Sequence, residues 1–338
     1  MIHHALRGCA LAMALAPLAQ AYAQSSAHIY GRIDIGVRSM KDVRSANNER
    51  VTQVADSSRG RLGFRGQEEL GSGLRAFFQL EHRFFGPTGA QDSDRYFKDK
   101  SWVGLAKEGV GDLRLGRMSS PINERGAGGR FEAFDGNTLA GMGGRGAAQV
   151  DKWDKTLALR SADIHGFRFM AAYSSRDGEG EKDAYGLQGE YGRGAWLFSV
   201  AWQQDARAAT ASGAADDWQT ASLAFSYRTK PLKLYGIAAH SWDIAPTDRG
   251  TATTYTVGAA VPLGIGELRT SYQASMQDTM NGVDRSADAQ RHRIGVGYEY
   301  PLSKLTLINL SLLHDRYQRT GENRRTGTGA EIALRKNF

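Results

Sequence analysis

Long hydrophobic runs, cysteine and proline are all scarce in this 338-residue chain. It holds one cysteine, Cys9, and seven prolines. A single cysteine excludes a disulfide framework and any zinc site built from cysteines. After residue 23 no segment approaches about 18 uninterrupted apolar residues, so the sequence predicts no transmembrane helix there. The mean hydropathy of −0.46 also excludes a bundle of membrane helices.

Motifs for catalysis and cofactor binding are missing as well. The eight histidines are scattered and form no H-E-x-x-H motif, so no metal site is predicted. His82, His240 and His292 fall within expected strands, where they are expected to pack at a rim or toward a lumen. A G-x-G-x-x-G spacing occurs over residues 141–146, but no strand–helix–strand unit surrounds it, so no cofactor is expected. No G-x-S-x-G motif occurs, and no catalytic residue is predicted.

Glycine and aromatic residues are abundant. The chain has 41 glycines, 13 tyrosines, 13 phenylalanines and 6 tryptophans. This composition favours many strands over long helices. The 43 basic residues exceed the 36 acidic ones by seven, which is a mild excess for this length and does not indicate a nucleic-acid partner.

Residues 1–23 are typical of a secretory signal peptide. They begin with a basic segment, continue with an apolar stretch over 8–18, and end in the A-x-A cleavage pattern A-Y-A. The apolar stretch is too short to span a bilayer. We therefore expect cleavage before Gln24, export from the cytoplasm, and a mature domain over residues 24–338.

Apolar and polar residues alternate along most of the mature chain. In residues 28–38, Ile29, Ile33 and Val37 share one face while Arg32 and Asp34 share the other, as the period of two in a strand requires. The same reading predicts sixteen strands, over residues 28–38, 59–69, 74–85, 95–107, 112–118, 153–162, 166–175, 182–192, 194–204, 216–229, 231–243, 251–262, 265–277, 290–300, 304–315 and 327–338.

The connectors between these strands alternate between short and long. Tight turns such as 71–73 and 109–111 take turns with longer polar connectors such as 39–58 and 278–289. An even number of strands, each long enough to cross the hydrocarbon layer, predicts an all-β fold: a sixteen-stranded antiparallel transmembrane β-barrel. A secreted sandwich or propeller is the alternative, but its strands would be about half as long and its core could not bury so many charges.

Three long motifs resemble one family. IYGRIDIGV at 29–37, RGRLGFRGQEELGSGLRAFFQLE at 59–81 and SWVGLAKEGVGDLRLGR at 101–117 resemble stretches of the general porins of Gram-negative, especially β-proteobacterial, outer membranes. The resemblance covers about residues 25–338 and implies location in the outer membrane. It also implies a homotrimer in contact with outer-membrane lipid and lipopolysaccharide. The terminal Phe338 would then be the signal that the barrel-assembly machinery recognises.

Charged residues fall on the strand faces opposite the apolar ones. An arginine facing lipid at mid-bilayer would cost about 2–4 kcal/mol, so these faces are predicted to line a wet lumen. A register error of one residue would invert a whole strand. The predicted pore-wall residues are Arg32, Asp34, Arg59, Arg61, Arg75, Arg114 and Arg160.

The longest stretch without a strand pattern lies between Arg117 and Trp153, and loops of this length are usually functional. In the resembled family the third external loop folds into the barrel and narrows it, and this segment likewise follows the fifth predicted strand. Its acidic residues would face the arginines of the opposite wall. An external loop with solvated charges is the alternative. The predicted constriction residues are Glu124, Arg125, Arg130, Glu132 and Asp135.

Together these observations predict a porin and not an enzyme. The expected function is passive diffusion of ions and small hydrophilic solutes through a water-filled channel with a weak preference for anions. Two alternatives remain: a substrate-specific outer-membrane channel and, less favoured, an outer-membrane barrel hydrolase.

Overall fold

The computed structural model describes residues 25–43, 49–142, 150–175, 183–206, 217–243, 250–278 and 288–338. The predicted signal peptide, residues 1–23, lies outside these residues. None of the helices in the described ranges is long and apolar enough to cross a bilayer.

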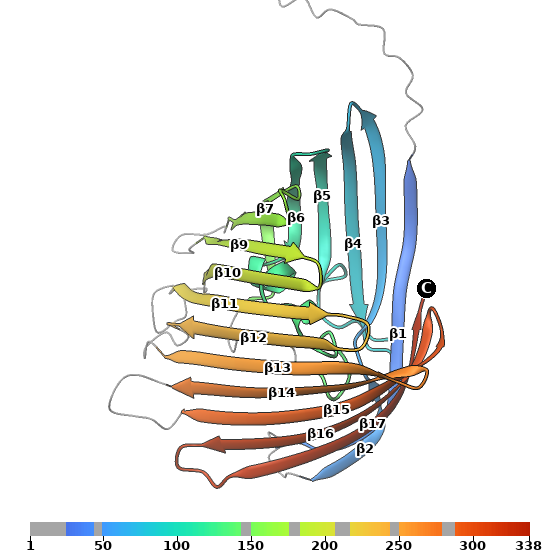
Figure 1. Ribbon diagram of the computed structural model, residues 1–338, viewed down its shortest axis with the longest axis vertical. Coiled ribbons are helices and arrows are strands. Elements are labelled where there is room, and N and C mark those ends of the chain that lie inside the picture. The colour runs from blue at the N-terminus through green and yellow to red at the C-terminus, as the bar shows by residue number, and fades with distance from the viewer. Residues whose placement is uncertain are drawn as a thin grey trace, which may run out of the picture.

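Nearly all of the described chain belongs to one antiparallel sheet, which curves around an open centre (Figure 1). Each strand pairs with a neighbour on both sides, so the sheet closes into a barrel. The strands are β1 (Ser26–Lys41), β2 (Arg50–Asp56), β3 (Gly60–Gly71), β4 (Leu74–Phe84), β5 (Lys100–Lys107), β6 (Gly111–Ser119), β7 (Lys152–Ser161), β8 (Phe167–Ser174), β9 (Ala184–Arg193), β10 (Trp196–Ala206), β11 (Asp217–Arg228), β12 (Lys233–Trp242), β13 (Thr251–Leu263), β14 (Gly266–Asp278), β15 (Ala289–Ser303), β16 (Thr306–Arg319) and β17 (Arg325–Asn337).

The barrel closes where the first strand meets the last. β1 pairs with β17 on one side, from Arg32↔Asn337 to Lys41↔Thr328. On its other side β1 pairs first with β3 and then with β2. β2 and β3 therefore form one barrel strand with a break at residues 57–59, and the described sheet has sixteen strands around its circumference. The predicted sixteen-stranded barrel is confirmed.

One strand was missed by the sequence pattern. Residues 50–56, predicted to lie within the long connector 39–58, form β2 instead. Its sequence RVTQVAD has no regular alternation, and nearly all of its residues are exposed. Pairing with β1 therefore imposes the extended conformation, which local sequence does not signal.

The predicted alternation between outer wall and lumen is confirmed on the strands where the pattern was clearest. On β1, Ile29, Ile33 and Val37 are exposed on the outer wall while Asp34 is fully buried on the inner side. On β17, Ile332 is exposed whereas its neighbour Glu331 is buried. The outer wall is thus apolar and the inner wall polar, as a barrel in lipid requires.

The two ends of the barrel differ in the length of their connections. Tight turns such as 264–265 join the strands at one end, where β1 begins and β17 ends. Long connections such as 85–99 and 120–151 join them at the other end. Outer-membrane barrels place short turns in the periplasm and long loops outside the cell, so the start of β1 and the end of β17 lie at the periplasmic end.

Candidate functional site

Residues 120–142, which follow β6, fold into the barrel. They contain two short helical turns, η1 (Ile122–Gly126) and η2 (Gly129–Phe131). In Figure 1 this green segment lies within the arc of strands and not beyond its edge. Ile122 and Phe131 are fully buried, in contact with the inner wall at Ala201, Ala224 and Ile237. The inward-folded position predicted for this loop is therefore the observed one.

Small residues on the inner wall make room for the loop. A Cβ atom at Gly295 would lie 2.3 Å from the carbonyl oxygen of Ala140, and one at Gly297 would lie 2.7 Å from the Phe134 ring. Since non-bonded atoms cannot approach so closely, any larger residue at these two positions would push the loop away from the wall. The loop thus packs along the inner side of β9–β17 and leaves the space beside β1–β7 open.

Glu132 anchors the loop to that wall. Its carboxylate accepts hydrogen bonds from the backbone N–H groups of Phe134 (3.0 Å) and Gly136 (2.8 Å) and from the Ser271 hydroxyl. The residue is 1% exposed, and burial raises the pKa of its carboxyl, although these hydrogen bonds oppose the shift. The structure therefore places Glu132 against the wall and not in the opening.

The opening lies between the loop and the wall of β1–β7, and its volume is about 800 Å³. The loop contributes Asn123, Glu124, Asp135 and Asn137 to its lining, and the wall and the adjoining segments contribute mostly charged side chains. The lining cations are Arg38, Arg59, Arg61, Arg83, Lys98, Lys100, Lys152 and Arg293, and the lining acids are Asp42, Asp56, Asp92, Asp99, Glu124, Asp135 and Asp151.

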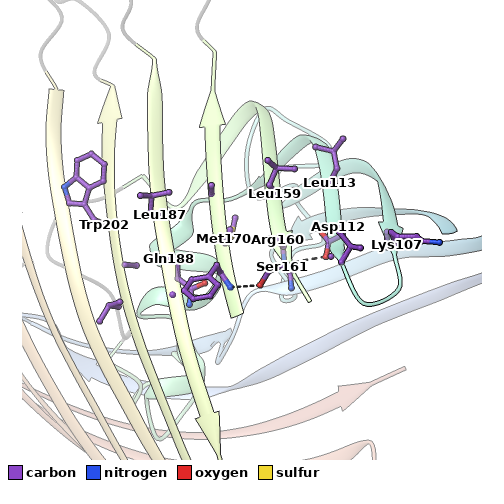
Figure 2. Close-up of a pocket in the computed structure, with 18 of the residues that line it drawn as sticks. Lys107, Asp112, Leu113, Leu159, Arg160, Ser161, Met170, Leu187, Gln188 and Trp202 are labelled. Atoms are coloured by element: carbon purple, nitrogen blue, oxygen red, sulfur yellow. Dashed lines mark hydrogen bonds and ion pairs between the residues drawn. The ribbon is translucent and has the colours of Figure 1, made fainter. Parts of the chain in front are cut away.

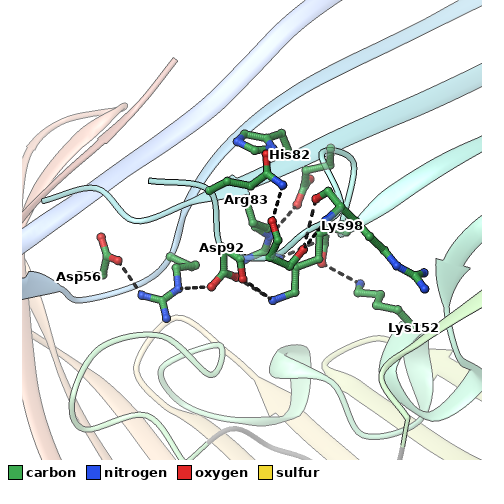
Figure 3. A network of polar contacts seen from close by, with 12 residues as sticks. Asp56, His82, Arg83, Asp92, Lys98 and Lys152 are labelled. Carbon is green, nitrogen blue, oxygen red and sulfur yellow. Dashed lines mark hydrogen bonds and ion pairs between the residues drawn. The ribbon is translucent and has the colours of Figure 1, made fainter. Parts of the chain in front are cut away.

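Buried carboxylates hold the wall cations in place (Figure 3). Glu81 lies 3.3 Å from Arg83, 3.9 Å from Lys100 and 4.0 Å from Arg61. Arg83 also donates a hydrogen bond to Asp99 at 3.0 Å. The Glu81 side chain is 2% exposed, whereas its three cationic partners are 20–27% exposed.

A second ion-pair cluster continues this wall toward the external end. Arg59 bridges Asp56 at 2.8 Å and Asp92 at 3.0 Å, and Lys98 binds Asp92 at 3.0 Å. The Arg59 and Lys98 side chains are 37–38% exposed, whereas the two aspartates are 6–13% exposed. In both clusters the cation therefore stands between the acid and the water of the lumen.

Glu124 faces the wall from the loop. Its carboxylate lies 3.2 Å from Arg160 and 3.7 Å from Arg114, both of which also approach Asp112. Burial alone would raise the pKa of Glu124, but these two guanidinium groups hold it below its usual value. The predicted opposition of a loop acid to wall arginines is thus present at Glu124, Arg114 and Arg160.

Asp135 projects from the loop without an ion-pair partner within 4 Å in the described part of the chain. Its side chain is accessible to lumen water. Desolvation by the surrounding protein nevertheless raises the pKa of its carboxyl, although the positive charges of Arg269 and Arg228 act to lower it. The neighbouring Asn137 accepts a hydrogen bond of 3.3 Å from the predicted wall residue Arg32.

Several predicted site residues lie outside the opening. Arg125 and Arg130 point from the loop to Glu190 on β9, at 3.1 and 2.9 Å. Asp34 is fully buried between β1 and β17, where it binds Arg335 at 2.8 Å. Arg75 lies nearer the periplasmic turn of β4, where it donates to Gln67. These side chains belong to the inner wall or the loop but do not line the opening.

Some lining residues escaped the sequence prediction. The alternation that places Arg75 inward continues along β4 to Arg83, so the same pattern could have predicted that Arg83 faces the lumen. Lys152 begins β7 one residue before the predicted start of the strand, so a small boundary error hid it.

The histidines His82, His240 and His292 lie on the outer face, where His82 stacks on Tyr96 and His292 contacts Tyr272. Within the described ranges no group of histidine, cysteine and carboxylate side chains could hold a metal ion.

An apolar outer wall, a charged lumen and an inward-folded loop together define a membrane channel of the β-barrel class. A family model described as Gram-negative porin matches residues 8–320, and the chain belongs to that family. It is an outer-membrane porin, which forms a water-filled channel for ions and small hydrophilic solutes.

Individual relatives agree with this assignment. The chain is 28% identical over 325 residues to outer membrane porin protein 32 of Delftia acidovorans, covering 89% of this chain and 88% of that protein. It is 26% identical to a major outer membrane protein P.IB of Neisseria gonorrhoeae, covering 97% and 98% of the two chains. The solved structure titled anion-selective porin from Comamonas acidovorans has a TM-score of 0.75 at 23% identity, covering 93% of this chain and all of that one.

Proposed function

We propose that this porin passes anions in preference to cations, by a small factor. The observation that carries the proposal is the depth of the ion pairs in the opening. Acids such as Glu81 and Asp56 lie behind their cationic partners, which reach further into the lumen. A passing solute therefore meets ammonium and guanidinium groups first. The porin titled anion-selective, from Comamonas acidovorans, gives this proposal further support.

The expected preference is weak because the charges nearly balance. Eight cations and seven acids line the opening. In water one charge at about 10 Å contributes about 0.4 kcal/mol, and salt screens part of it. No single side chain therefore sets the selectivity, and only the summed field across the opening does.

Recording from the purified mature protein in planar bilayers tests this proposal. We expect stepwise ohmic conductance and, in a salt gradient, a reversal potential on the anion-selective side. A reversal potential on the cation-selective side would overturn the anion preference while leaving the channel intact. Lack of any conductance from a correctly folded barrel would contradict the channel function itself.

We propose that transport is passive, without a catalytic step. The opening is lined by paired charges, which can steer a solute but which no observation links to bond cleavage. A substrate-specific channel is the second candidate, and block of the ion current that saturates with one solute class would favour it. Hydrolysis of a lipid ester by the pure protein would contradict the passive role.

We infer a homotrimer from the outer wall. Exposed tyrosines and tryptophans lie on β8–β15, for example Tyr185, Trp196 and Tyr272, where such side chains mark a lipid–water interface. In the described strands β1–β6 the exposed large apolar side chains are aliphatic or phenylalanine, such as Val103 and Leu105. This wall suits contact with another barrel. Native mass spectrometry in mild detergent should give three chains, and a single-chain mass would contradict the inference.

We also propose how the chain reaches the membrane. Phe338 pairs with Gly31 of β1 through two backbone hydrogen bonds of 2.9 and 3.1 Å, so the terminal residue stands at the closing seam, where the assembly machinery would recognise it. Deletion of Phe338 should lower the amount of folded barrel in the outer membrane. Sequencing of the mature N-terminus tests the predicted removal of residues 1–23. Contact with outer-membrane lipid and lipopolysaccharide completes the proposed set of partners.

A further inference from the structure

A smaller cavity lies on the inner wall of β1, β3, β4 and β5, on the periplasmic side of the opening. Its volume is about 330 Å³. Along β4 and β5 it follows directly after Glu81 and Lys100, which belong to the cationic wall described above. We call this cavity the aromatic pocket, and its lining side chains on the inner face are His28, Arg65, Gln67, Phe77, Gln79 and Trp102.

Register explains why these side chains meet. His28 is directly opposite Arg65, Arg65 is opposite Gln79, and Gln79 is opposite Trp102. They form one row across four neighbouring strands. The remaining two members face each other in the next row toward the periplasm. Strands lie about 4.8 Å apart, so the row spans about 15 Å of the inner wall.

Two aromatic rings are fixed against each other in the pocket. The centroids of Phe77 and Trp102 are 5.3 Å apart, and the rings meet edge to face at 77°. Glycine at position 104 permits this contact, since a Cβ atom there would lie 2.9 Å from the Phe77 ring. Aromatic rings favour such edge-to-face or offset contacts, so a third ring could join this pair in the same way.

Guanidinium groups lie over the same rings. The Arg114 guanidinium is 4.5 Å from the Trp102 centroid and 5.5 Å from the Phe77 centroid. The Arg75 guanidinium is also 5.5 Å from the Phe77 centroid. Cations are attracted to ring faces by the negative charge of the π-system. This part of the wall therefore combines flat apolar surface with positive charge.

Two cations at the pocket have no acid beside them. Within the described ranges Arg65 and Arg75 form no ion pair with a carboxylate: Arg65 lies 5.4 Å from the Tyr30 ring, and Arg75 donates a hydrogen bond of 3.3 Å to Gln67. No acid is among the described residues that line the pocket, whereas acids and cations nearly balance in the opening. The pocket is therefore the more favourable of the two spaces for a bound anion.

Two amide side chains add hydrogen-bonding groups. Gln67 accepts the hydrogen bond from Arg75 with its carbonyl oxygen, so among the described residues its NH2 group is left as a donor for a ligand. Gln79 donates to the Tyr30 hydroxyl at 2.6 Å, and that hydroxyl donates to Glu81 at 2.8 Å. This chain of hydrogen bonds fixes the Gln79 side chain at the edge of the pocket.

A larger groove on the outer wall provides a contrast (Figure 2). Its volume is about 1000 Å³, and apolar side chains such as Leu113 line it. Both cations among its described lining residues have protein partners. Arg160 lies 3.8 Å from Asp112, and Lys107 donates to the carbonyl of Ser72. Of these two cavities the aromatic pocket is therefore the one that suits an anion.

We propose that the aromatic pocket binds small aromatic carboxylates, such as benzoate, on their way through the channel. The carboxylate pairs with Arg65 and accepts a hydrogen bond from Gln67, while the ring packs against Phe77 and Trp102. A cavity of this size is at the lower end of the range for ligand sites, which suits an acid with one ring. A solute must also leave a channel site readily, so we expect a Kd on the order of 1 mM.

This site extends the anion preference proposed above and rests on it in one respect. A carboxylate from outside the cell must cross the opening before it reaches the pocket. Binding at the pocket itself depends only on the residues that line it. The two proposals can therefore fail separately.

The first experiment measures binding without ionic current. Fluorine NMR of 4-fluorobenzoate, titrated with the purified mature porin in mild detergent, should show saturable line broadening. Arg65→Gln should weaken the affinity at least about tenfold, as expected for losing a charge-assisted hydrogen bond. Arg316→Gln is the matched control, because Arg316 lies on the outer wall of β16. It should bind the probe as the unmodified porin does.

A second variant tests the rings without changing charge. Phe77→Leu should weaken the affinity about threefold, as expected for losing one ring contact. Cyclohexanecarboxylate has the same charge and a similar size but no aromatic ring, so it should displace the probe less effectively than benzoate. Equal displacement by the two acids would overturn the proposal, as would unchanged affinity in either variant.

Two further results separate this site from its alternatives. Displacement of the probe by inorganic phosphate at the same concentration as benzoate would show a site for any anion and would overturn the proposal. Lack of probe binding by a porin whose reversal potential is anion-selective would overturn the aromatic pocket alone. Probe binding that depends on Arg65, in a porin with a cation-selective reversal potential, would support the pocket and overturn only the anion preference.

Discussion

The two sides of the lumen are lined by different kinds of residue. The wall of β10–β17 presents small residues such as Ala201, Gly258 and Gly295, and the inward loop packs on it through Phe131 and Phe134. The wall of β1–β7 presents long cations held by buried acids and remains in contact with water. The first wall determines where the loop lies, and the second determines which charge a solute meets. Size and charge selection are therefore separable by mutation.

The largest effect is expected from the small-residue wall. Gly295→Leu places side-chain atoms where the Ala140 carbonyl now lies, so the loop must move off the wall. If it moves out of the lumen, single-channel conductance should rise about twofold, which planar-bilayer recording measures. Gly189→Leu is the control, because a Cβ at Gly189 meets only ordinary contacts at 3.5 Å or more. Unchanged conductance in a folded Gly295→Leu barrel would contradict the role assigned to this wall.

Neutralising the charged wall should change selectivity with much less effect on conductance. In Arg61→Gln/Arg83→Gln two cations disappear and Glu81 loses two of its partners. We expect the anion-to-cation permeability ratio to fall roughly twofold per charge removed, as one charge at about 10 Å implies. Reversal potentials in a salt gradient measure the ratio. Arg316→Gln removes one positive charge from the outer wall and should leave the ratio unaltered.

A change on the loop side should act in the opposite direction. Glu124→Gln removes the acid that faces Arg114 and Arg160, so both guanidinium groups gain influence over the lumen. The permeability ratio should rise up to about twofold. A fall in the ratio would mean that Arg114 and Arg160 depend on Glu124 for their position more than they are neutralised by it.

The smallest effect is expected from acidification. Burial raises the pKa of Asp135, whereas the wall arginines hold the pKa of Glu124 low. As the pH falls, Asp135 therefore loses its negative charge first, and anion preference should increase slightly while Glu124 is still ionised. Reversal potentials between pH 7 and pH 4, about the ordinary aspartate value, measure the change. Asp135→Asn should remove this first step, and its persistence in that variant would assign it to another carboxyl.

Most of the barrel was predictable because each strand has one face in lipid and the other in lumen water. Apolar residues are favoured on the lipid face and charges are tolerated on the lumen face, so segments such as 28–38 show a clear alternation. β2 was missed by the sequence pattern because nearly all of its residues are exposed, so its sequence shows no alternation of apolar and polar residues. Its conformation depends on pairing with β1, which is a tertiary effect.

The position of the inward loop was predictable, but the roles of its individual residues were only partly so. Family resemblance indicated that the segment after the fifth predicted strand folds inward. Charge alone could not separate Glu124, which faces the wall arginines, from Glu132, which is used to fix the loop. That distinction depends on the turn geometry at Phe134 and Gly136 and on the distant Ser271. Arg125 and Arg130 likewise point to Glu190, which is about 60 residues away in sequence.

The break between β2 and β3 links the constriction to the closing seam. Ser57 accepts a backbone hydrogen bond from Thr138 of the loop and donates its hydroxyl to Glu331 of the last strand, which also accepts from the Leu139 N–H. One carboxylate on the final strand thus fastens both the loop and the broken strand. The loop can reach this resting place only after the last strand has met the first. We therefore expect the lumen to reach its final width only at a late step of barrel assembly.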